Sequence, residues 1–334
     1  MKMLFARVVA LIAYYCGLDA LFYWLNRRAK RIITFHNVLP DAMFREGVAN
    51  GVSSRLSCFE KIVDECRKRF EFSTDLFDAK TLTITFDDGY RNQYSVAFKS
   101  LQRRGIPAYL FVSGDCLENK ALVVDLLTHW IDNVPCGAYK LDLNGELKVC
   151  EIVSSNRAQV WEDVLWPLFI CDGANFGRSV LAACDKAYPI QKILDALPEE
   201  YVAERLRGIS SKECEELRSA GWKIGWHTRS HYPLAKLDVG KVKSELDAPA
   251  EFRNVCLSYP YGNPSEVGDA AVELAESLGY PCAVSNTNTA AENKSKCFLP
   301  RMALSADKYR LHLELSGCCY FIRHLRLLPK MACK

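Results

Sequence analysis

The sequence predicts an α/β fold in which parallel strands alternate with helices. Short β-branched or aromatic runs recur along the chain, and each stops at a polar residue. Segments with the apolar spacing of helices lie between these runs. The 334 residues are 49% hydrophobic and 25% charged, which is the composition of a globular protein. These observations exclude a disordered, collagen-like or fibrous chain.

Residues 1–30 are expected to form an amphipathic helix, because apolar side chains recur at alternating spacings of four and three. The longest uncharged run, Val8–Leu18, has eleven residues and falls short of the ~20 needed to span a bilayer. Three interpretations stay open: a helix lying in the membrane interface, a signal peptide, or a terminal helix packed on the domain's own core. We favour the packed or interfacial helix, and the sequence does not separate these two.

The net charge of +3 is too small to indicate a nucleic-acid-binding protein. The charge is unevenly distributed along the chain. The net charge is +5 for residues 1–31, +4 for residues 321–334 and −6 for the residues between them. The basic and apolar C-terminal segment, 321–334, therefore resembles the N-terminal one. We expect both ends to be able to contact a membrane surface.

Fifteen cysteines are scattered through apolar stretches, and no CxxC pair occurs. Zinc ribbons and thioredoxin-type motifs are thereby excluded. We expect cysteines buried as small apolar side chains in a reducing compartment. The predicted location is cytoplasmic, with peripheral attachment at the inner membrane as an option, and a secreted protein is disfavoured.

The interior of the chain, after residue 30, alternates between the two kinds of element. Strands are expected at 31–35, 81–86, 107–112, 222–226 and 255–259, and helices at 57–70, 92–104, 211–220, 239–251 and 269–278. Residues 119–208 interrupt this order with three tryptophans and few strand signals. We interpret them as a helical insertion placed over the core.

The first chemically informative group is Asp87-Asp88-Gly89-Tyr90 at the end of a predicted strand. Two adjacent carboxylates at a strand end repel each other, so that one of them requires a cation or a proton. An Asp-Gly pair after a strand is also a common turn sequence, which is the competing interpretation.

The second group is His227-Thr228-Arg229-Ser230-His231, directly after another predicted strand. Two imidazoles four residues apart can converge on one cation if the backbone coils between them. Either histidine alone would be an ordinary turn residue. With one aspartate from the other strand end they make a three-ligand site with an open position, which suits Zn²⁺. Fe(II) accepts the same ligand set, but its usual HxD spacing is missing here.

The motifs Thr85-Phe86-Asp87-Asp88-Gly89-Tyr90, His227–His231 and Ser258-Tyr259-Pro260-Tyr261-Gly262 occur in the order and spacing of a known family. In these motifs the chain resembles the polysaccharide deacetylases of the NodB-homology type, carbohydrate esterase family 4. The resemblance covers roughly residues 31–315, within a catalytic domain taken as 31–320. It implies an incomplete or distorted (β/α) barrel with the site at the carboxyl ends of the strands.

The resemblance also implies roles for individual residues. Asp87 would be the general base that acts on the attacking water. Asp88, His227 and His231 would hold one divalent metal ion, with Zn²⁺ expected and Co²⁺ or Ni²⁺ as alternatives. The backbone N–H of Tyr261 would help to hold the tetrahedral oxyanion. The residues expected to line the substrate groove are Tyr90, Pro260, Tyr261 and Gly262.

The chain departs from the family pattern at two places. Many members carry an arginine just before the PxY segment, where this chain has Ser258. Arg301 at an expected strand end is the favoured substitute, ahead of Arg253. The usual late histidine motif has no match, and His312 has the features of a helix-face residue.

His36 offers a replacement for the missing late histidine. It follows the strand at 31–35, as in a branch that resembles the poly-N-acetylglucosamine deacetylases, whose barrel is circularly permuted. We therefore expect His36 to be the general acid rather than a structural histidine, with a nearby carboxylate such as Asp87 favouring its protonated form.

The sequence hence predicts a metal-dependent hydrolase that removes an N-acetyl group from an amino sugar of a polysaccharide or a lipid-linked glycan. A deformylase or deacetylase of a small amino sugar remains an alternative, and O-deacetylation is chemically open. A glycan-binding module of the same fold that has lost turnover is the alternative from another class of protein. Neither the sugar nor the linkage can be inferred from the sequence.

Overall fold

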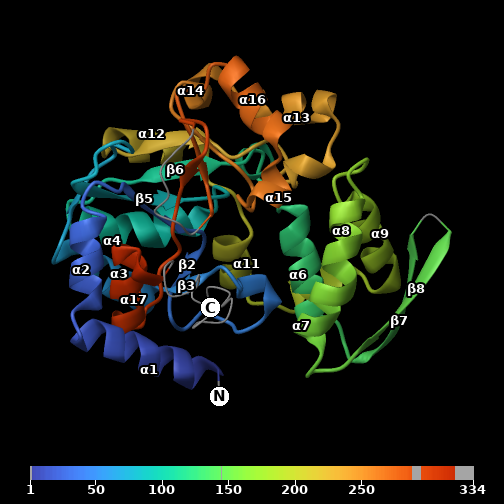
Figure 1. Ribbon diagram of the computed structural model, residues 1–334. Helices are drawn as coiled ribbons and strands as arrows, with labels where there is room; N and C mark the ends of the chain where they lie inside the picture. The colour runs from blue at the N-terminus through green and yellow to red at the C-terminus, as the bar shows by residue number, and fades with distance from the viewer. Residues whose placement is uncertain (1, 144, 288–294, 320–334) are drawn as a thin grey trace.

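The computed structural model describes residues 2–143, 145–287 and 295–319, with side-chain burial given from residue 7 onward. Its centre is a barrel of short parallel strands surrounded by helices, and a second group of helices with a long hairpin lies to one side (Figure 1). The predicted sequence of alternating elements is present, so the expected α/β class is confirmed.

Seven parallel strands follow one another around the barrel in the order β1-β5-β6-β9-β10-β11-β12. Their bounds are Arg31–Phe35 (β1), Thr81–Phe86 (β5), Tyr109–Val112 (β6), Lys223–Trp226 (β9), Leu257–Ser258 (β10), Ala283–Ser285 (β11) and Leu299–Pro300 (β12). Two backbone hydrogen bonds close the circle, from Thr34 N to Met302 O and from Met302 N to Ile32 O, each 2.9 Å long. A complete barrel of this kind has eight strands, so the expected incomplete barrel is confirmed.

The remaining short strands do not extend the ring. β4 (Glu71–Phe72) pairs with the start of β5, and β2 (Val38–Leu39) pairs with β3 (Ser54–Arg55) in a separate sheet.

Alternate strand residues face two different cores, as the pleat of a strand requires. One set packs against the surrounding helices and forms the largest hydrophobic cluster, with Ile33, Ile84 and Leu110 among its members. The opposite set forms a smaller cluster that includes Ile32, Phe111 and Val284. Cys256 and Cys282 belong to this smaller cluster, which agrees with the prediction of cysteines buried as small apolar residues.

The helices around the barrel follow the strands in sequence. They are α3 (Leu56–Arg67), α4 (Lys99–Gln102), α5 (Gly114–Leu117), α12 (Ser211–Ser219), α13 (Val239–Leu246), α14 (Ala250–Arg253), α15 (Pro264–Val267), α16 (Asp269–Ser277) and α17 (Lys308–Ser316). Short non-α turns lie at Val48–Asn50, Gln93–Phe98 and Leu234–Lys236. The single helix expected at 239–251 is in fact two, α13 and α14, because Pro249 cannot continue a helix and starts a new one.

The insertion has its own hydrophobic core, which includes Trp130, Leu165 and Phe169. Its helices are α6 (Val123–Asn133), α7 (Arg157–Val160), α8 (Trp166–Cys171), α9 (Arg178–Ala187), α10 (Ile190–Asp195) and α11 (Glu199–Arg205), with a further turn at Trp161–Leu165. Most of the insertion is helical, as expected, but it also contains an antiparallel hairpin that was not expected, formed by β7 (Gly137–Leu143) and β8 (Glu146–Ile152), which projects from it (Figure 1).

The N-terminal segment also differs from the single helix that was expected. It forms α1 (Lys2–Tyr15) and α2 (Leu18–Leu25), which meet at a bend of 74°. Gly17 lies at the bend with φ of 73°, a left-handed conformation that glycine adopts without strain. α1 and α2 pack on α17 at one side of the barrel, so part of this segment does lie on the domain's own core (Figure 1).

Candidate active site

Residues from five strands of the barrel meet at one rim, because parallel strands all end on the same side. The register places Phe35 beside Phe86 and Val112 beside Trp226, so the residues that follow these strands are neighbours. The site residues that follow directly on the strands are His36 after β1, Asp87 and Asp88 after β5, His227 after β9, and Arg301 after β12. The predicted convergence of the two sequence motifs is therefore present.

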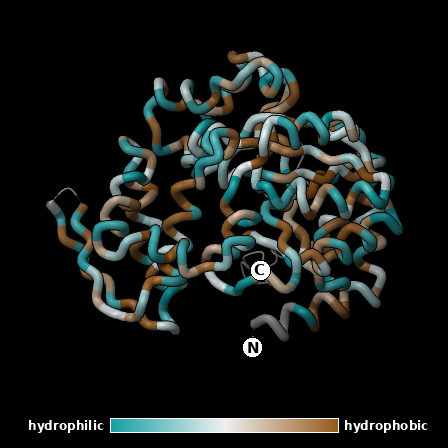
Figure 2. Tube along the Cα trace, turned by 180° about the vertical axis from the view of Figure 1, so that it is seen from behind, coloured by the Kyte–Doolittle hydropathy of each residue, from teal (hydrophilic) through white to brown (hydrophobic). Residues whose placement is uncertain are grey.

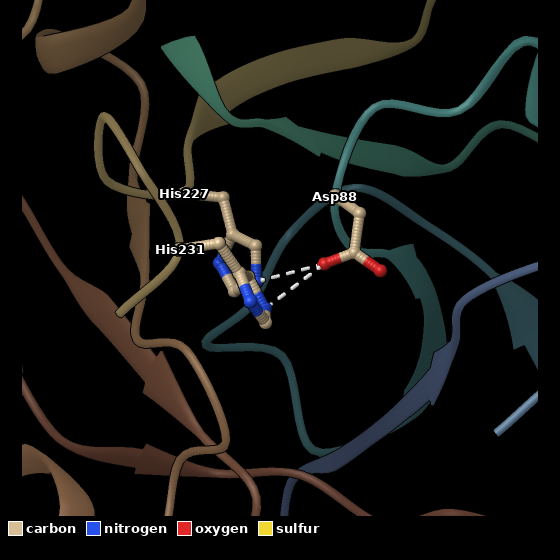
Figure 3. A group of neighbouring side chains, drawn as sticks. All are labelled: Asp88, His227 and His231. Carbon is tan, nitrogen blue, oxygen red and sulfur yellow. Dashed lines mark ion pairs between the residues drawn. The ribbon is translucent and has the colours of Figure 1, made fainter. Parts of the chain in front are cut away.

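Asp88, His227 and His231 form a buried cluster with their ligand atoms turned toward one another (Figure 3). Asp88 Oδ1 lies 3.3 Å from His227 Nε2 and 3.1 Å from His231 Nε2. Asp88 Oδ1 and His227 Nε2 are buried and have no hydrogen-bond partner in the described part of the chain. Buried polar atoms of this kind need a partner, and a cation would provide one.

The geometry of the three side chains fits a metal ion such as zinc. Bonds of about 2.0–2.1 Å to tetrahedral zinc place two ligand atoms roughly 3.4 Å apart, close to both measured separations. His227 Nδ1 lies 2.7 Å from the carbonyl oxygen of Ser258 and donates to it. That hydrogen bond leaves the Nε2 lone pair of His227 directed at Asp88, which is the tautomer required of a metal ligand.

Charge in the cluster also favours a cation. Burial alone would raise the pKa of Asp88, but the His231 and His227 imidazoles hold it well below its usual range. Burial alone would lower the pKa of His231, but the Asp88 carboxylate raises it. The ionised carboxylate therefore persists in a fully buried position, where it requires positive charge beside it.

The backbone is strained at the loops that carry these residues. Asp88, Thr228, His231 and Tyr261 all have positive φ angles, between 54° and 83°, which are uncommon for residues with a Cβ atom. Such conformations persist when the surrounding structure imposes them, and they gather at functional sites.

A carboxylate from α13 holds the turn that carries His231. Glu245 accepts hydrogen bonds from Ser230 N at 2.8 Å and from Ser230 Oγ at 2.7 Å. Thr228 Oγ1 accepts a further bond from His231 N at 3.2 Å. Glu245 was not found by sequence reasoning, because a lone glutamate in a helix gives no signal of such a contact.

Asp87 is held by the residue that was expected to replace the missing arginine. Arg301 donates to Asp87 Oδ1 at 2.7 Å and to Asp87 Oδ2 at 2.5 Å, and all these groups are fully buried. Ser258 Oγ lies 3.1 Å from Asp87 Oδ1 and 2.9 Å from Arg301 Nη2. Ser258 and Arg301 thus contact the same carboxylate from two different strands, β10 and the end of β12.

The Arg301 guanidinium determines the charge of Asp87. Burial alone would raise the pKa of Asp87, but Arg301 and His227 hold it below its usual range. The two adjacent aspartates are therefore both ionised for different reasons, Asp87 through Arg301 and Asp88 through the histidines.

His36 lies beside Asp87, with His36 Nε2 3.9 Å from Asp87 Oδ2. Its pKa is lowered, because burial outweighs the attraction of Asp88 and Asp87. Asp87 does favour the protonated form of this imidazole, as expected, but its effect on the pKa is smaller than that of burial. The role of His36 as general acid stays a prediction. Gln93 Nε2 donates to the carbonyl oxygens of His36, at 3.0 Å, and of Asp87, and so ties the two strand ends together.

The Pro260-Tyr261-Gly262 segment borders the histidines. The Tyr261 ring centroid lies 4.9 Å from that of His231 and 5.1 Å from that of Trp166 in the insertion. Gly262 has φ of 74°, and a Cβ there would lie 2.4 Å from Asn286 N. No acceptor among the described residues takes the N–H of Tyr261, so this donor is available to a ligand oxygen.

Tyr90 is almost fully buried, and its hydroxyl donates to Asp125 of α6. Asp125 in turn accepts from Arg205 Nη2 at 2.9 Å, so the loop after β5 is joined to the insertion. Asp125 and Arg205 were not found by sequence reasoning. A role for Tyr90 in substrate binding stays a prediction.

Arg253 and His312, which the sequence analysis considered as substitutes for the missing arginine and histidine, pair with acidic residues outside the site. Arg253 pairs with Asp247 at 2.6 Å, and His312 Nε2 lies 2.9 Å from Glu65 Oε1 on a neighbouring helix. His312 is thus a helix-face residue, as its sequence features indicated.

With the geometry described, similarity to known proteins becomes informative. Residues 75–133, which contain the Asp87-Asp88 motif, match the family model of the polysaccharide deacetylases. No curated protein sequence matched the chain.

Two solved structures share the fold over nearly their whole length. The Streptococcus pyogenes deacetylase PplD in complex with acetate is 13% identical with a TM-score of 0.50, over 86% of this chain and 98% of that one. IcaB from Ammonifex degensii is 15% identical with a TM-score of 0.50, over 87% of this chain and 97% of that one. Identity this low establishes the fold alone. Taken with the family match, it confirms the resemblance inferred from the motifs and the prediction of a carbohydrate deacetylase among the hydrolases.

Proposed function

We propose that this protein is a metal-dependent hydrolase that removes N-acetyl groups from amino sugars of a polysaccharide or a lipid-linked glycan. The observation that carries the proposal is the pairing of two sites at one rim. A buried Asp–His–His cluster with unpartnered ligand atoms lies beside a buried aspartate that Arg301 holds in its ionised form.

Each part of the rim has a task in amide hydrolysis. Asp88, His227 and His231 would hold the metal ion, which would supply a Lewis acid for the substrate carbonyl and for the attacking water. Asp87 removes a proton from the attacking water, and Arg301 keeps its carboxylate oriented and ionised. The Tyr261 N–H donates to the oxygen of the former carbonyl as it gains negative charge.

His36 supplies the proton that the leaving nitrogen needs. Since its pKa is lowered, the imidazole is neutral at rest and must receive a proton during the reaction. Asp87, 3.9 Å away, carries the proton taken from water and is the nearest source. His36 Nε2 then protonates the amine as the carbon–nitrogen bond breaks, and acetate and a free amino sugar are formed.

We further propose a cytoplasmic location. In support of it, all fourteen cysteines described in the structure are free.

The metal site is tested by elemental analysis of protein purified without added metal. The wild type should contain about one Zn²⁺, Co²⁺ or Ni²⁺ ion per chain, and the variant His227→Ala/His231→Ala should contain none. A wild type that stays metal-free after supply of Zn²⁺ or Co²⁺ would contradict the proposal.

Asp87→Asn separates an enzyme from a binding module. The variant should keep its metal and lose acetate release from N-acetylated oligosaccharides by roughly a hundred- to ten-thousand-fold, because an amide cannot act as the base. Asp115→Asn is the matched control, since Asp115 is a buried acid of α5 outside the cluster, and it should retain activity. A metal-loaded wild type that binds these oligosaccharides without releasing acetate would instead support the binding module. Release of formate from N-formylated sugars would support the deformylase.

A further inference from the structure

The N-terminal helices α1 and α2 have one side packed on the protein. Ala10 and Ala13 of α1 are buried against Leu313 of α17 and against Cys318, which follows that helix. Asp19 of α2 is buried as well, 3.8 Å from Arg69. The two helices are therefore attached to the domain along this inner face.

Their opposite face is apolar and open to solvent. Seven large apolar side chains of these two helices are between 38% and 70% exposed. They are Val8, Leu11, Ile12, Tyr15, Leu21, Trp24 and Leu25. The other exposed large apolar residues of the described chain are scattered over the loops, the hairpin and the start of α13. In Figure 2, brown segments mark this stretch of α1 close to the N-terminus.

Basic residues outnumber acidic ones along α1 and α2, although Arg7 of α1 pairs with Asp307 at 3.3 Å. Between residues 7 and 30 the single acid is Asp19, which is buried, whereas Arg27 and Arg28 are exposed. Arg27 lies over the Trp24 ring at 5.0 Å from its centroid, and Lys30 lies over the exposed ring of Phe77 at 4.6 Å. The described chain ends at Cys319, packed on α1, and the sequence beyond it carries four basic residues and no acid.

We propose that the outer faces of α1 and α2 dock on the surface of a bilayer that contains anionic phospholipid. Apolar side chains inserted at the level of the headgroups, aromatic rings among them and flanking arginines that attract lipid phosphates are the features of interfacial helices. No single described helix is long and apolar enough to cross a membrane, and the bent pair of α1 and α2 passes such a test only in length and composition. Because the inner face is packed on α17, the helices lie along the surface and hold the barrel against it.

The docking surface is tested with extruded vesicles and the full chain in a sedimentation assay. The wild type should bind vesicles with about a third phosphatidylglycerol in phosphatidylcholine at least tenfold more strongly than vesicles of phosphatidylcholine alone, and added salt should reduce the difference. The variant Ile12→Gln/Leu21→Gln/Leu25→Gln should lose at least tenfold in binding. Arg27→Gln/Arg28→Gln should mainly lose the preference for the anionic lipid.

The hairpin provides a matched control. Leu147 and Val149 of β8 are 58% and 63% exposed, so that Leu147→Gln/Val149→Gln removes exposed apolar surface of the same kind from another part of the molecule. This variant should bind vesicles like the wild type. All variants should release acetate from a soluble substrate at the wild-type rate, so a failure of this inference is distinguishable from a failure of the proposed activity.

Several results would overturn the inference. Unchanged vesicle binding by the triple variant would show that these side chains do not carry it. A concentration-dependent dimer that the triple variant abolishes, seen by light scattering, would make a second copy the partner of this face. A fall in melting temperature that parallels the loss of binding would show that part of the chain covers it. Protein isolated from cells without its first 25 or so residues would identify a signal peptide.

Discussion

The adjacent aspartates of the site differ in what surrounds them rather than in sequence. Asp87 meets the Arg301 guanidinium and the Ser258 hydroxyl, and Asp88 meets two imidazoles. A buried carboxylate is stable only with such partners, so each one requires its own source of positive charge. These two environments account for the different roles proposed for Asp87 as the base and Asp88 as a metal ligand.

Arg301→Lys tests whether Arg301 acts by positioning Asp87. Lysine keeps the charge but not the two parallel hydrogen bonds, so kcat/KM should fall roughly 10- to 100-fold, as expected for about 1.5–3 kcal/mol from one charge-assisted bond. Because Arg301 lowers the pKa of Asp87 against the effect of burial, weaker pairing raises that pKa. The acidic limb of the pH profile of kcat/KM should therefore move to higher pH. Ser258→Ala should shift it less, in the same direction, and an unchanged profile would rule out this role for Arg301.

The site residues that could be predicted from the sequence all belong to motifs or to strand ends. His36, Asp87 and Arg301 follow strands whose apolar runs are readable in the sequence, and the parallel order brings them together. Glu245 and Gln93 could not be predicted in this way. Their contacts arise from how α13 and the turn at 93–98 pack on the barrel, which no local pattern specifies.

At the scale of elements, the strands were predicted better than the connections. The bounds of β1 and β5 agree with the prediction, since a short run of β-branched and aromatic residues between polar ones has few alternatives. The hairpin of β7 and β8 was missed although Asn144-Gly145 stands between two runs of alternating character, a sequence typical of two-residue turns. The bend between α1 and α2 at Gly17 was missed because the apolar spacing continues across it.

The helix α8 joins the insertion to the Tyr261 segment of the site. Its Trp166 ring packs against Tyr261 with an interplanar angle of 63°. Trp166→Ala removes this support from the segment whose N–H is proposed to hold the oxyanion, so kcat should fall by about three- to thirtyfold with the metal content unchanged. Trp161→Ala is the control, because Trp161 lies 6.0 Å from Trp166 on the same insertion and makes no described ring contact with Tyr261. Equal effects of the two variants would assign the loss to the insertion's core instead of to Tyr261.

At the scale of the whole molecule, a buried polar network joins the insertion to the barrel. Asp125 and His129 of α6 and Arg205 of α11 are all nearly fully buried. Asp125 accepts from Tyr90 after β5, and Arg205 Nε donates to Asn50 Oδ1 at 3.1 Å. Buried networks of this kind stabilise one arrangement of the parts because breaking any member leaves an unpaired polar group. The position of the insertion beside the barrel thus depends on groups whose protonation changes with pH.

His129 makes this dependence measurable. Burial and the neighbouring Arg205 cation lower the pKa of His129 to about 4, whereas the unfolded chain has an ordinary histidine. Between pH 6.5 and 4 the unfolded state therefore binds more protons than the folded one, and the free energy of unfolding falls as the pH falls. The contribution of one such group approaches about 1.4 kcal/mol per pH unit in this window and vanishes above it.

His129→Gln should remove that contribution. The amide stays neutral and can still accept from the Tyr201 hydroxyl, which lies 3.1 Å from His129 Nε2. Denaturant unfolding at a series of pH values should give a variant that is less stable than the wild type at pH 7 but whose stability declines less steeply below pH 6.5. Parallel curves for the two proteins would mean that His129 is already protonated in the folded state. Acid sensitivity of the fold would then come from carboxylates whose pKa the fold lowers, Asp87 and Asp88 among them, because a lowered pKa gives stability that is lost as the pH falls below the ordinary range of a carboxyl group.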